Sequence, residues 1–112
     1  MIWFLRICFA LVIATMLAVT TWSSLRESIL AISPAVTGDP WFIATMFDAY
    51  FGFLTFFVWV AYKEQSLPAR IAWLAAILVL GNMAMATYAL IQLFRVPPTA
   101  SLGDVLLRKA TI

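Results

Sequence analysis

The chain has 112 residues, of which 65% are hydrophobic and 11% are charged, and its net charge is +2. A soluble domain carries about 25% charged residues, so a soluble domain this small could not cover so much apolar surface by itself. The few cations are scattered, which excludes the basic stripe of a nucleic-acid-binding protein. Histidine is absent and Cys8 is the only cysteine, which excludes a Ser-His-Asp triad and a disulfide within the chain. We expect one transmembrane domain, residues 1–112.

Three apolar stretches predict three membrane-spanning helices, at about residues 3–25, 40–62 and 69–95. Each provides roughly the 20 mostly apolar residues that a helix needs to cross the hydrocarbon. None of them alternates with the two-residue period of a barrel strand. The connector 63–68 is short, so we expect the second and third spans to form an antiparallel hairpin. The predicted fold is therefore all-α, an integral membrane domain with three transmembrane helices.

Capping residues mark the ends of the predicted helices. Asp39-Pro40 opens the second span, because the carboxylate can accept from free backbone N–H groups and proline suits the first helical position. Ser66 has the same role at the start of the third span. Pro97-Pro98 cannot continue a helix. Ser101 and Asp104 have capping-box spacing, which predicts one or two helical turns within a short surface tail, residues 99–112.

The N-terminal stretch resembles a secretory signal, but no cleavage site of the A-x-A kind follows it, so it is interpreted as a retained membrane helix. The connector 23–39 is either a short interfacial helix or a continuation of the first span. Orientation rests on the Lys and Arg close to the spans. Three lie on the N-terminal side (Arg6, Lys63 and Arg70) and two on the other (Arg26 and Arg95). The positive-inside rule then favours a cytoplasmic N-terminus and an outer C-terminus. We expect the membrane to be a bacterial inner membrane.

Asp48 is the one charged residue inside a predicted span. It lies about two turns, roughly 10 Å, inside the second span. A charge within a span costs a few kcal/mol, so it usually faces protein or water. We predict a polar cluster around Asp48, formed with Thr20, Thr21, Tyr88 and Gln92 at similar depth. Two interpretations stay open, a hydrogen-bonded pin that fixes helix register and a proton- or cation-linked site.

The sequence predicts two further features, an ion pair near the N-terminal side of the membrane and an aromatic face along the second span. Arg6 and Glu64 both lie near the first turn from that interface, which predicts an ion pair of little energetic value if it is wet. The second span holds ten of the seventeen aromatic residues. Such rings are common where helices meet lipid headgroups. A face that binds lipid or a partner helix is therefore predicted at Phe53, Phe56, Phe57 and Trp59.

Small residues at helical spacing predict where helices pack in lipid. The stripes are Ala10, Ala14 and Ala18 in the first span; Ala44, Asp48, Gly52 and Thr55 in the second; and Gly81, Ala84, Tyr88 and Gln92 in the third. Each predicted helix thus has one side suited to contact with protein.

A pattern centred on the second span resembles a known family. Its residues are Pro40-Trp41, Ala44-Thr45, Asp48, Tyr50, Trp59-Val60, Tyr62-Lys63-Glu64 and Gly81. The chain is similar there to an uncharacterised family of small three-helix integral membrane proteins of bacteria and plants, classified as a domain of unknown function. The resemblance covers about residues 6–92 and leaves out the tail after Pro98. It implies the three-helix fold and no activity.

The sequence has no Gly-rich phosphate loop and no CxxC, HExxH or GxSxG motif, so we predict no enzyme, catalytic residue, metal site or cofactor. The leading hypothesis is an accessory or assembly subunit of a larger membrane complex, which contacts partner helices and lipid. One alternative is a small homo-oligomeric transporter or channel with Asp48 lining the pathway. Another is the binding of lipid or quinone along the aromatic second helix.

Overall fold

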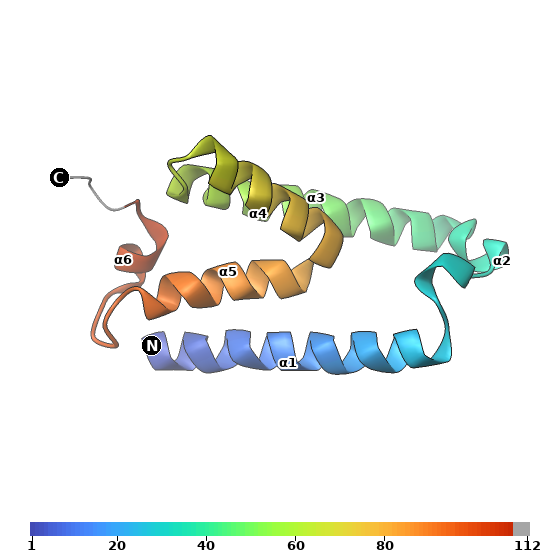
Figure 1. The fold of residues 1–112 in the computed structure, drawn as a ribbon, viewed down its shortest axis with the longest axis horizontal. Coiled ribbons are helices and arrows are strands. Elements are labelled where there is room, and N and C mark those ends of the chain that lie inside the picture. The colour runs from blue at the N-terminus through green and yellow to red at the C-terminus, as the bar shows by residue number, and fades with distance from the viewer. Residues whose placement is uncertain (109–112) are drawn as a thin grey trace.

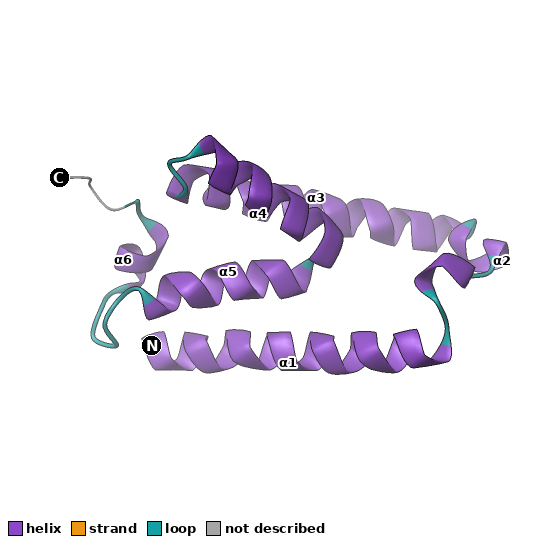
Figure 2. Ribbon diagram, viewed as in Figure 1, coloured by secondary structure: helices purple, strands orange, loops and turns teal. Residues whose placement is uncertain are grey.

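The computed structural model describes residues 1–108 as an assembly of helices, 54 × 28 × 22 Å in extent (Figures 1 and 2). The elements are α1 (Ile2–Arg26), a 3-10 turn (Ile29–Ala31), α2 (Pro34–Thr37), α3 (Pro40–Lys63), α4 (Leu67–Leu80), α5 (Asn82–Phe94) and α6 (Leu102–Leu106). No strand occurs in the described residues. The all-α prediction is therefore confirmed, while the last four residues of the predicted tail lie outside the described part.

Within residues 1–108, α1 and α3 are the two helices that are long and apolar enough to cross a membrane, with 25 and 24 residues. α3 begins as its sequence predicts, since Oδ1 of Asp39 accepts from the backbone N–H groups of Trp41 at 2.9 Å and Phe42 at 3.3 Å. Ser66 caps α4, and Ser101 with Asp104 forms a capping box on α6. Local hydrogen bonding thus sets where these helices start.

The third predicted span, residues 69–95, is not one continuous helix. It is broken at Gly81, which has φ +60° and ψ −126°. A Cβ at this position would lie 2.9 Å from Cζ of Phe53, so glycine is needed both for the positive φ and for the close approach of α3. α4 packs against α3, whereas α5 packs chiefly against α1. This break corrects the prediction that residues 69–95 form one continuous helix.

Because of the break, α5 runs back toward the start of α1 (Figure 1). The end of α5 therefore lies beside the N-terminus, and the two described chain ends share one end of the molecule. A third helix continued straight through Gly81 would instead have ended at the opposite end of the molecule. Composition alone does not predict such a reversal, because a single glycine is tolerated inside a helix.

Two buried clusters hold the helices together at this end of the molecule. The first joins α1, α5 and α6 through Ile2, Leu93, Val96 and Val105. The second joins α3, α4 and α5 through Val60, Ile77, Ala84 and Tyr88. The opposite halves of α1 and α3 carry mostly exposed side chains, with only a few half-buried between residues 10 and 52. The core is thus confined to the half of the molecule that contains α4 and α5.

Candidate functional site

Asp48 is exposed on the half of α3 that α4 and α5 leave uncovered. Thr20 and Thr21 are also exposed, on the corresponding half of α1. No contact of the described residues pairs the Asp48 carboxylate with another side chain. The small residues on either side of it along α3, Ala44, Gly52 and Thr55, are exposed as well. We call these four residues of α3 the Asp48 stripe.

The Asp48 stripe is available for contact with another helix. A Cβ added to Gly52 would meet no atom within 4 Å. The hydroxyl of Thr55 is engaged only with its own helix, since it donates to the carbonyl of Phe51 at 2.8 Å. Small side chains let helix backbones approach closely. In this chain, however, α4 and α5 pack on a different face of α3.

The predicted polar cluster is not assembled, because Tyr88 and Gln92 belong to the other half of the molecule. Both are buried in α5, with Tyr88 0% and Gln92 4% exposed. Tyr88 is enclosed by rings, with centroids 4.8 Å from Trp73 and 5.4 Å from Trp59. The prediction assumed that α5 continues away from the N-terminal end. The break in the third segment instead carries α5 back, away from Asp48.

The predicted aromatic face is turned inward. Phe53, Phe56, Phe57 and Trp59 are half-buried and pack against the cluster that contains Tyr88. Phe56 and Trp59 meet Tyr88 edge-on. The outward rings and aliphatic side chains of α3 are instead Phe47, Phe51, Leu54 and Val58, which follow one another at helical spacing and are all exposed. The inward face thus holds α4 and α5 in place, which corrects its interpretation as a free partner or lipid face.

Arg6 does not pair with Glu64 in the described part of the chain. Its guanidinium donates from Nε and Nη2 to the carbonyl oxygen of Leu93, and from Nη2 to that of Val96 at 2.9 Å. The same group lies over the rings of Trp3, at 4.7 Å, and Phe94, at 4.4 Å. A cation at the end of α5 satisfies carbonyls that have no partner within the helix. The physical reason for the changed partner is again the reversal of α5.

Glu64 has a different role from the predicted one. It ends α3, where its backbone N–H donates to the carbonyl of Val60 at 2.8 Å. Its own carbonyl accepts from Nε of Arg70 at 2.8 Å, which ties the start of α4 to the end of α3. Sequence reasoning missed this bond and the Arg6 bonds, because both connect a side chain to a backbone carbonyl that no residue pattern identifies.

α6 closes this end of the molecule through bonds to α3. The indole N–H of Trp59 donates to the carbonyl of Leu106 at 2.9 Å, and Nζ of Lys63 donates to the carbonyls of Val105 and Leu107. Beneath α6 lies an apolar pocket of about 370 Å³, lined by Leu5, Phe9, Phe56, Trp59, Ala89, Leu93, Leu102, Val105 and Leu106. This lining provides contact for hydrocarbon and no group that acts in catalysis.

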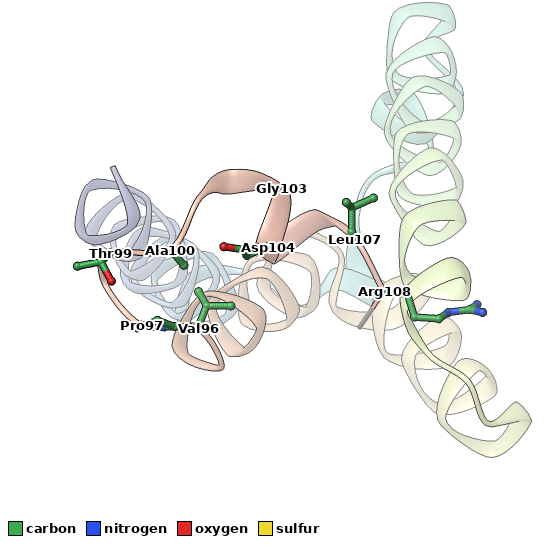
Figure 3. A pocket seen from close by; sticks show the side chains of 8 residues that line it. All are labelled: Val96, Pro97, Thr99, Ala100, Gly103, Asp104, Leu107 and Arg108. Atoms are coloured by element: carbon green, nitrogen blue, oxygen red, sulfur yellow. The ribbon is translucent and has the colours of Figure 1, made fainter. Parts of the chain in front are cut away.

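A second pocket, of about 500 Å³, lies in the tail between the end of α5 and Arg108 (Figure 3). It contains two charged side chains, Asp104 and Arg108. The carboxylate of Asp104 accepts from the backbone N–H of Ser101, and the guanidinium of Arg108 donates to the carbonyl of Tyr62. Both are therefore engaged in holding the tail. No three His, Cys, Asp or Glu side chains come together anywhere in residues 1–108.

Comparisons with known proteins bear on the family resemblance. No curated protein and no solved structure matches the chain significantly. A family model matches residues 1–111, so the expected membership of a family without an assigned function is confirmed, and the match includes the tail that the resemblance had left out. The chain belongs to the family described as "Protein of unknown function (DUF1475)".

Proposed function

We propose that this protein crosses a membrane with α1 and α3 and serves there as a non-catalytic accessory subunit of a larger membrane complex. The observation that carries the proposal is the exposed Asp48 stripe on α3. α3 has 24 residues, roughly 36 Å of helix against roughly 30 Å of hydrocarbon. Asp48 lies about 12 Å from the start of this helix by the same rise per residue, which puts its carboxylate at hydrocarbon depth.

The exposure of α1 and α3 supports a membrane environment. An apolar helix in the core of a soluble protein is mostly buried, whereas only 6% of the apolar window of α3 and 11% of that of α1 are buried. Side chains as large as Trp22, Phe51 and Val58 are more than half exposed. Monomeric soluble proteins rarely expose apolar patches of this extent. Lipid or another protein must therefore cover these helices.

Lipid alone does not stabilise the Asp48 carboxylate, because hydrocarbon offers it no hydrogen-bond donor or counter-charge. A charged side chain near the centre of a membrane helix costs about 2.5–3.5 kcal/mol on insertion scales, so it usually pairs with another group. None of the described contacts of this chain supplies that group. The small residues beside Asp48 suit close approach of a further helix. We infer that a helix of another subunit packs on the Asp48 stripe and presents a donor or a cation to the carboxylate.

A photo-crosslinking side chain at Gly52 tests this proposal in native membranes, because a side chain there meets no atom of this chain within 4 Å. We expect a discrete product with one other polypeptide. The matched control is Val58, which is 69% exposed on a different face of the same helix and should not give that product. Products of equal yield from both positions would show unselective contact and contradict the proposal.

The role of the carboxylate is tested by two substitutions of similar size. Asp48→Asn keeps a hydrogen-bond acceptor and should retain the Gly52 crosslink. Asp48→Leu leaves the partner's donor unpaired in lipid, a loss of about 2–5 kcal/mol, and should lower the yield at least about tenfold. An unchanged yield in Asp48→Leu would contradict pairing. A product of two copies of this chain would favour the homo-oligomeric transporter instead, for which Asp48-dependent proton flux in liposomes is the further measurement.

A further inference from the structure

We propose that α4 and α5 enter and leave the same membrane leaflet without crossing it, and that the cationic end of the molecule binds the anionic phospholipid headgroups of that leaflet. This inference rests on the proposed membrane location of α1 and α3, but not on the proposed partner. It replaces three spans with two spans and a re-entrant helical pair, with both described chain ends on one side of the membrane.

The lengths of the two short helices support re-entry. α4 has 14 residues and α5 has 13, which correspond to roughly 21 Å and 20 Å. A helix needs roughly 20 residues to cross about 30 Å of hydrocarbon, so neither helix is long enough alone. Together they would be long enough only if the chain continued in one direction through Gly81.

Contacts along the pair show that the direction reverses. Tyr50, in the middle of α3, donates from its hydroxyl to the carbonyl of Leu78 at the end of α4. Seven residues after Gly81, the ring of Tyr88 again lies against Trp59, close to the C-terminal end of α3. The Arg6 bonds then bring the end of α5 beside the first turns of α1. The turn of the pair is thus at mid-depth of α3, and both outer ends are at the same end of the molecule.

Part of the backbone at the turn finds partners within the chain, while the N-terminus of α5 has no side-chain cap. The N–H of Gly81 donates to the carbonyl of Ile77 at 2.8 Å, and its carbonyl accepts from the N–H of Met85 at 3.1 Å. The Tyr50 hydroxyl supplies a partner for the carbonyl of Leu78 at 3.3 Å. Gly81 itself is buried. A non-helical break at membrane depth is tolerated where protein buries it and partners are present.

The reversal changes the distribution of charge. Five of the six Lys and Arg in the described residues gather at the end that contains the N-terminus: Arg6, Lys63, Arg70, Arg95 and Arg108. This end also holds the carboxylates Glu64 and Asp104, whereas the opposite end has one cation, Arg26, with Glu27 next to it in the sequence and Asp39 at the start of α3. A continuous third span would have separated Arg95 and Arg108 from the other three. The positive-inside rule therefore places the cationic end in the cytoplasm more clearly than the sequence does.

Anionic phospholipid headgroups are the partner that fits this end. Cations next to a membrane helix attract the negative headgroups of the cytoplasmic leaflet. Arg95 is exposed at the C-terminal end of α5, and none of the described hydrogen bonds uses its guanidinium. Arg26 is likewise exposed, at the opposite end and next to an acidic residue, which makes it a matched control.

Single cysteines in a Cys8→Ser background test the topology in sealed membranes with an impermeant maleimide. Gln65, Thr99 and Ile29 are exposed positions in three different connecting segments. We expect Gln65 and Thr99 to react from the same side and Ile29 from the other. Reaction of Thr99 together with Ile29 would overturn re-entry while leaving the proposed partner face intact. Reaction of all three from both sides would contradict the membrane location on which both proposals rest.

Phosphatidylglycerol in nanodiscs otherwise made of phosphatidylcholine tests the headgroup site. The melting temperature of the protein should rise with the fraction of phosphatidylglycerol. Arg95→Gln should weaken the apparent affinity about fivefold, the effect of one cation near an anionic surface. Arg26→Gln should change it little. An equal loss in both variants, or no preference for phosphatidylglycerol in the unmodified protein, would overturn the headgroup site.

Discussion

The Arg6 guanidinium donates two hydrogen bonds to the carbonyl oxygen of Leu93, from Nε at 3.3 Å and from Nη2 at 3.0 Å. Arg6 is 6% exposed and Leu93 is 2% exposed, so the contact is protected from water. It joins residues 87 positions apart and ties the end of α5 to the first turns of α1.

Arg6→Leu should therefore destabilise the purified protein by about 2 kcal/mol, since hydrogen bonds to charged groups contribute about 1.5–3 kcal/mol and the carbonyls would stay buried. Equilibrium unfolding in mixed micelles measures the loss. Arg26→Leu is the control, because Arg26 is exposed and stacks only over Trp22. Equal losses in the two variants would argue against the tie between α1 and α5.

Gly81→Ala should destabilise the protein by about 1–3 kcal/mol, because alanine at φ +60° is strained and its Cβ would meet Phe53 at 2.9 Å. Gly52→Ala provides the control, since nothing lies within 4 Å of a Cβ there. The control should be neutral or slightly stabilising, as alanine is the better helix former. A neutral Gly81→Ala would indicate that the third segment is a continuous helix after all.

Tyr88→Phe should change the free energy of unfolding by less than about 1 kcal/mol, or stabilise the protein slightly. The Tyr88 hydroxyl is buried without a hydrogen-bond partner in the described residues, so its removal relieves a desolvation cost. Tyr88→Ala should cost about 3–5 kcal/mol, because the cluster of rings around it would lose its centre. A large loss in Tyr88→Phe would instead reveal a hydrogen bond to the hydroxyl.

Trp59→Phe should loosen α6, because it removes the donor to the Leu106 carbonyl while keeping an aromatic ring in place. The loss of a hydrogen bond of about 1 kcal/mol corresponds to amide exchange about fivefold faster in residues 102–106. Hydrogen exchange with peptide-level resolution measures it. Trp73→Phe is the matched control, since Trp73 contacts Tyr88 but not α6. Equal acceleration in both variants would show that ring packing, not the indole bond, retains α6.

The features that could be predicted from the sequence are those set by neighbouring residues. The apolar runs predicted α1 and α3, and Asp39, Ser66 and Ser101 predicted the starts of three helices. Each of these depends on side chains within four residues of one another. The family could be identified in the same way, from a pattern concentrated in one helix.

The break at Gly81 could not be predicted, because the apolar run around it has the length and composition of a complete span. A single glycine inside such a run is tolerated in a helix, so its presence does not by itself predict a break. What decides here is the ring of Phe53, 28 positions away, which occupies the space of a Cβ. Because the predicted direction of α5 was wrong, the predicted cluster of Asp48 with Tyr88 and the predicted Arg6–Glu64 ion pair were wrong as well. One tertiary contact thus accounts for both errors at the candidate site.

The central claim is that α5 returns to the N-terminal end of the molecule, and a pair of spin-label distances tests it most directly. Labels at Thr99 and Trp3 should be close together, whereas labels at Thr99 and Ile29 should be separated by roughly the length of α1, about 37 Å for its 25 residues. Pulsed electron paramagnetic resonance on the purified protein measures both distances. The opposite order, with Thr99 near Ile29 and far from Trp3, would contradict the reversal at Gly81.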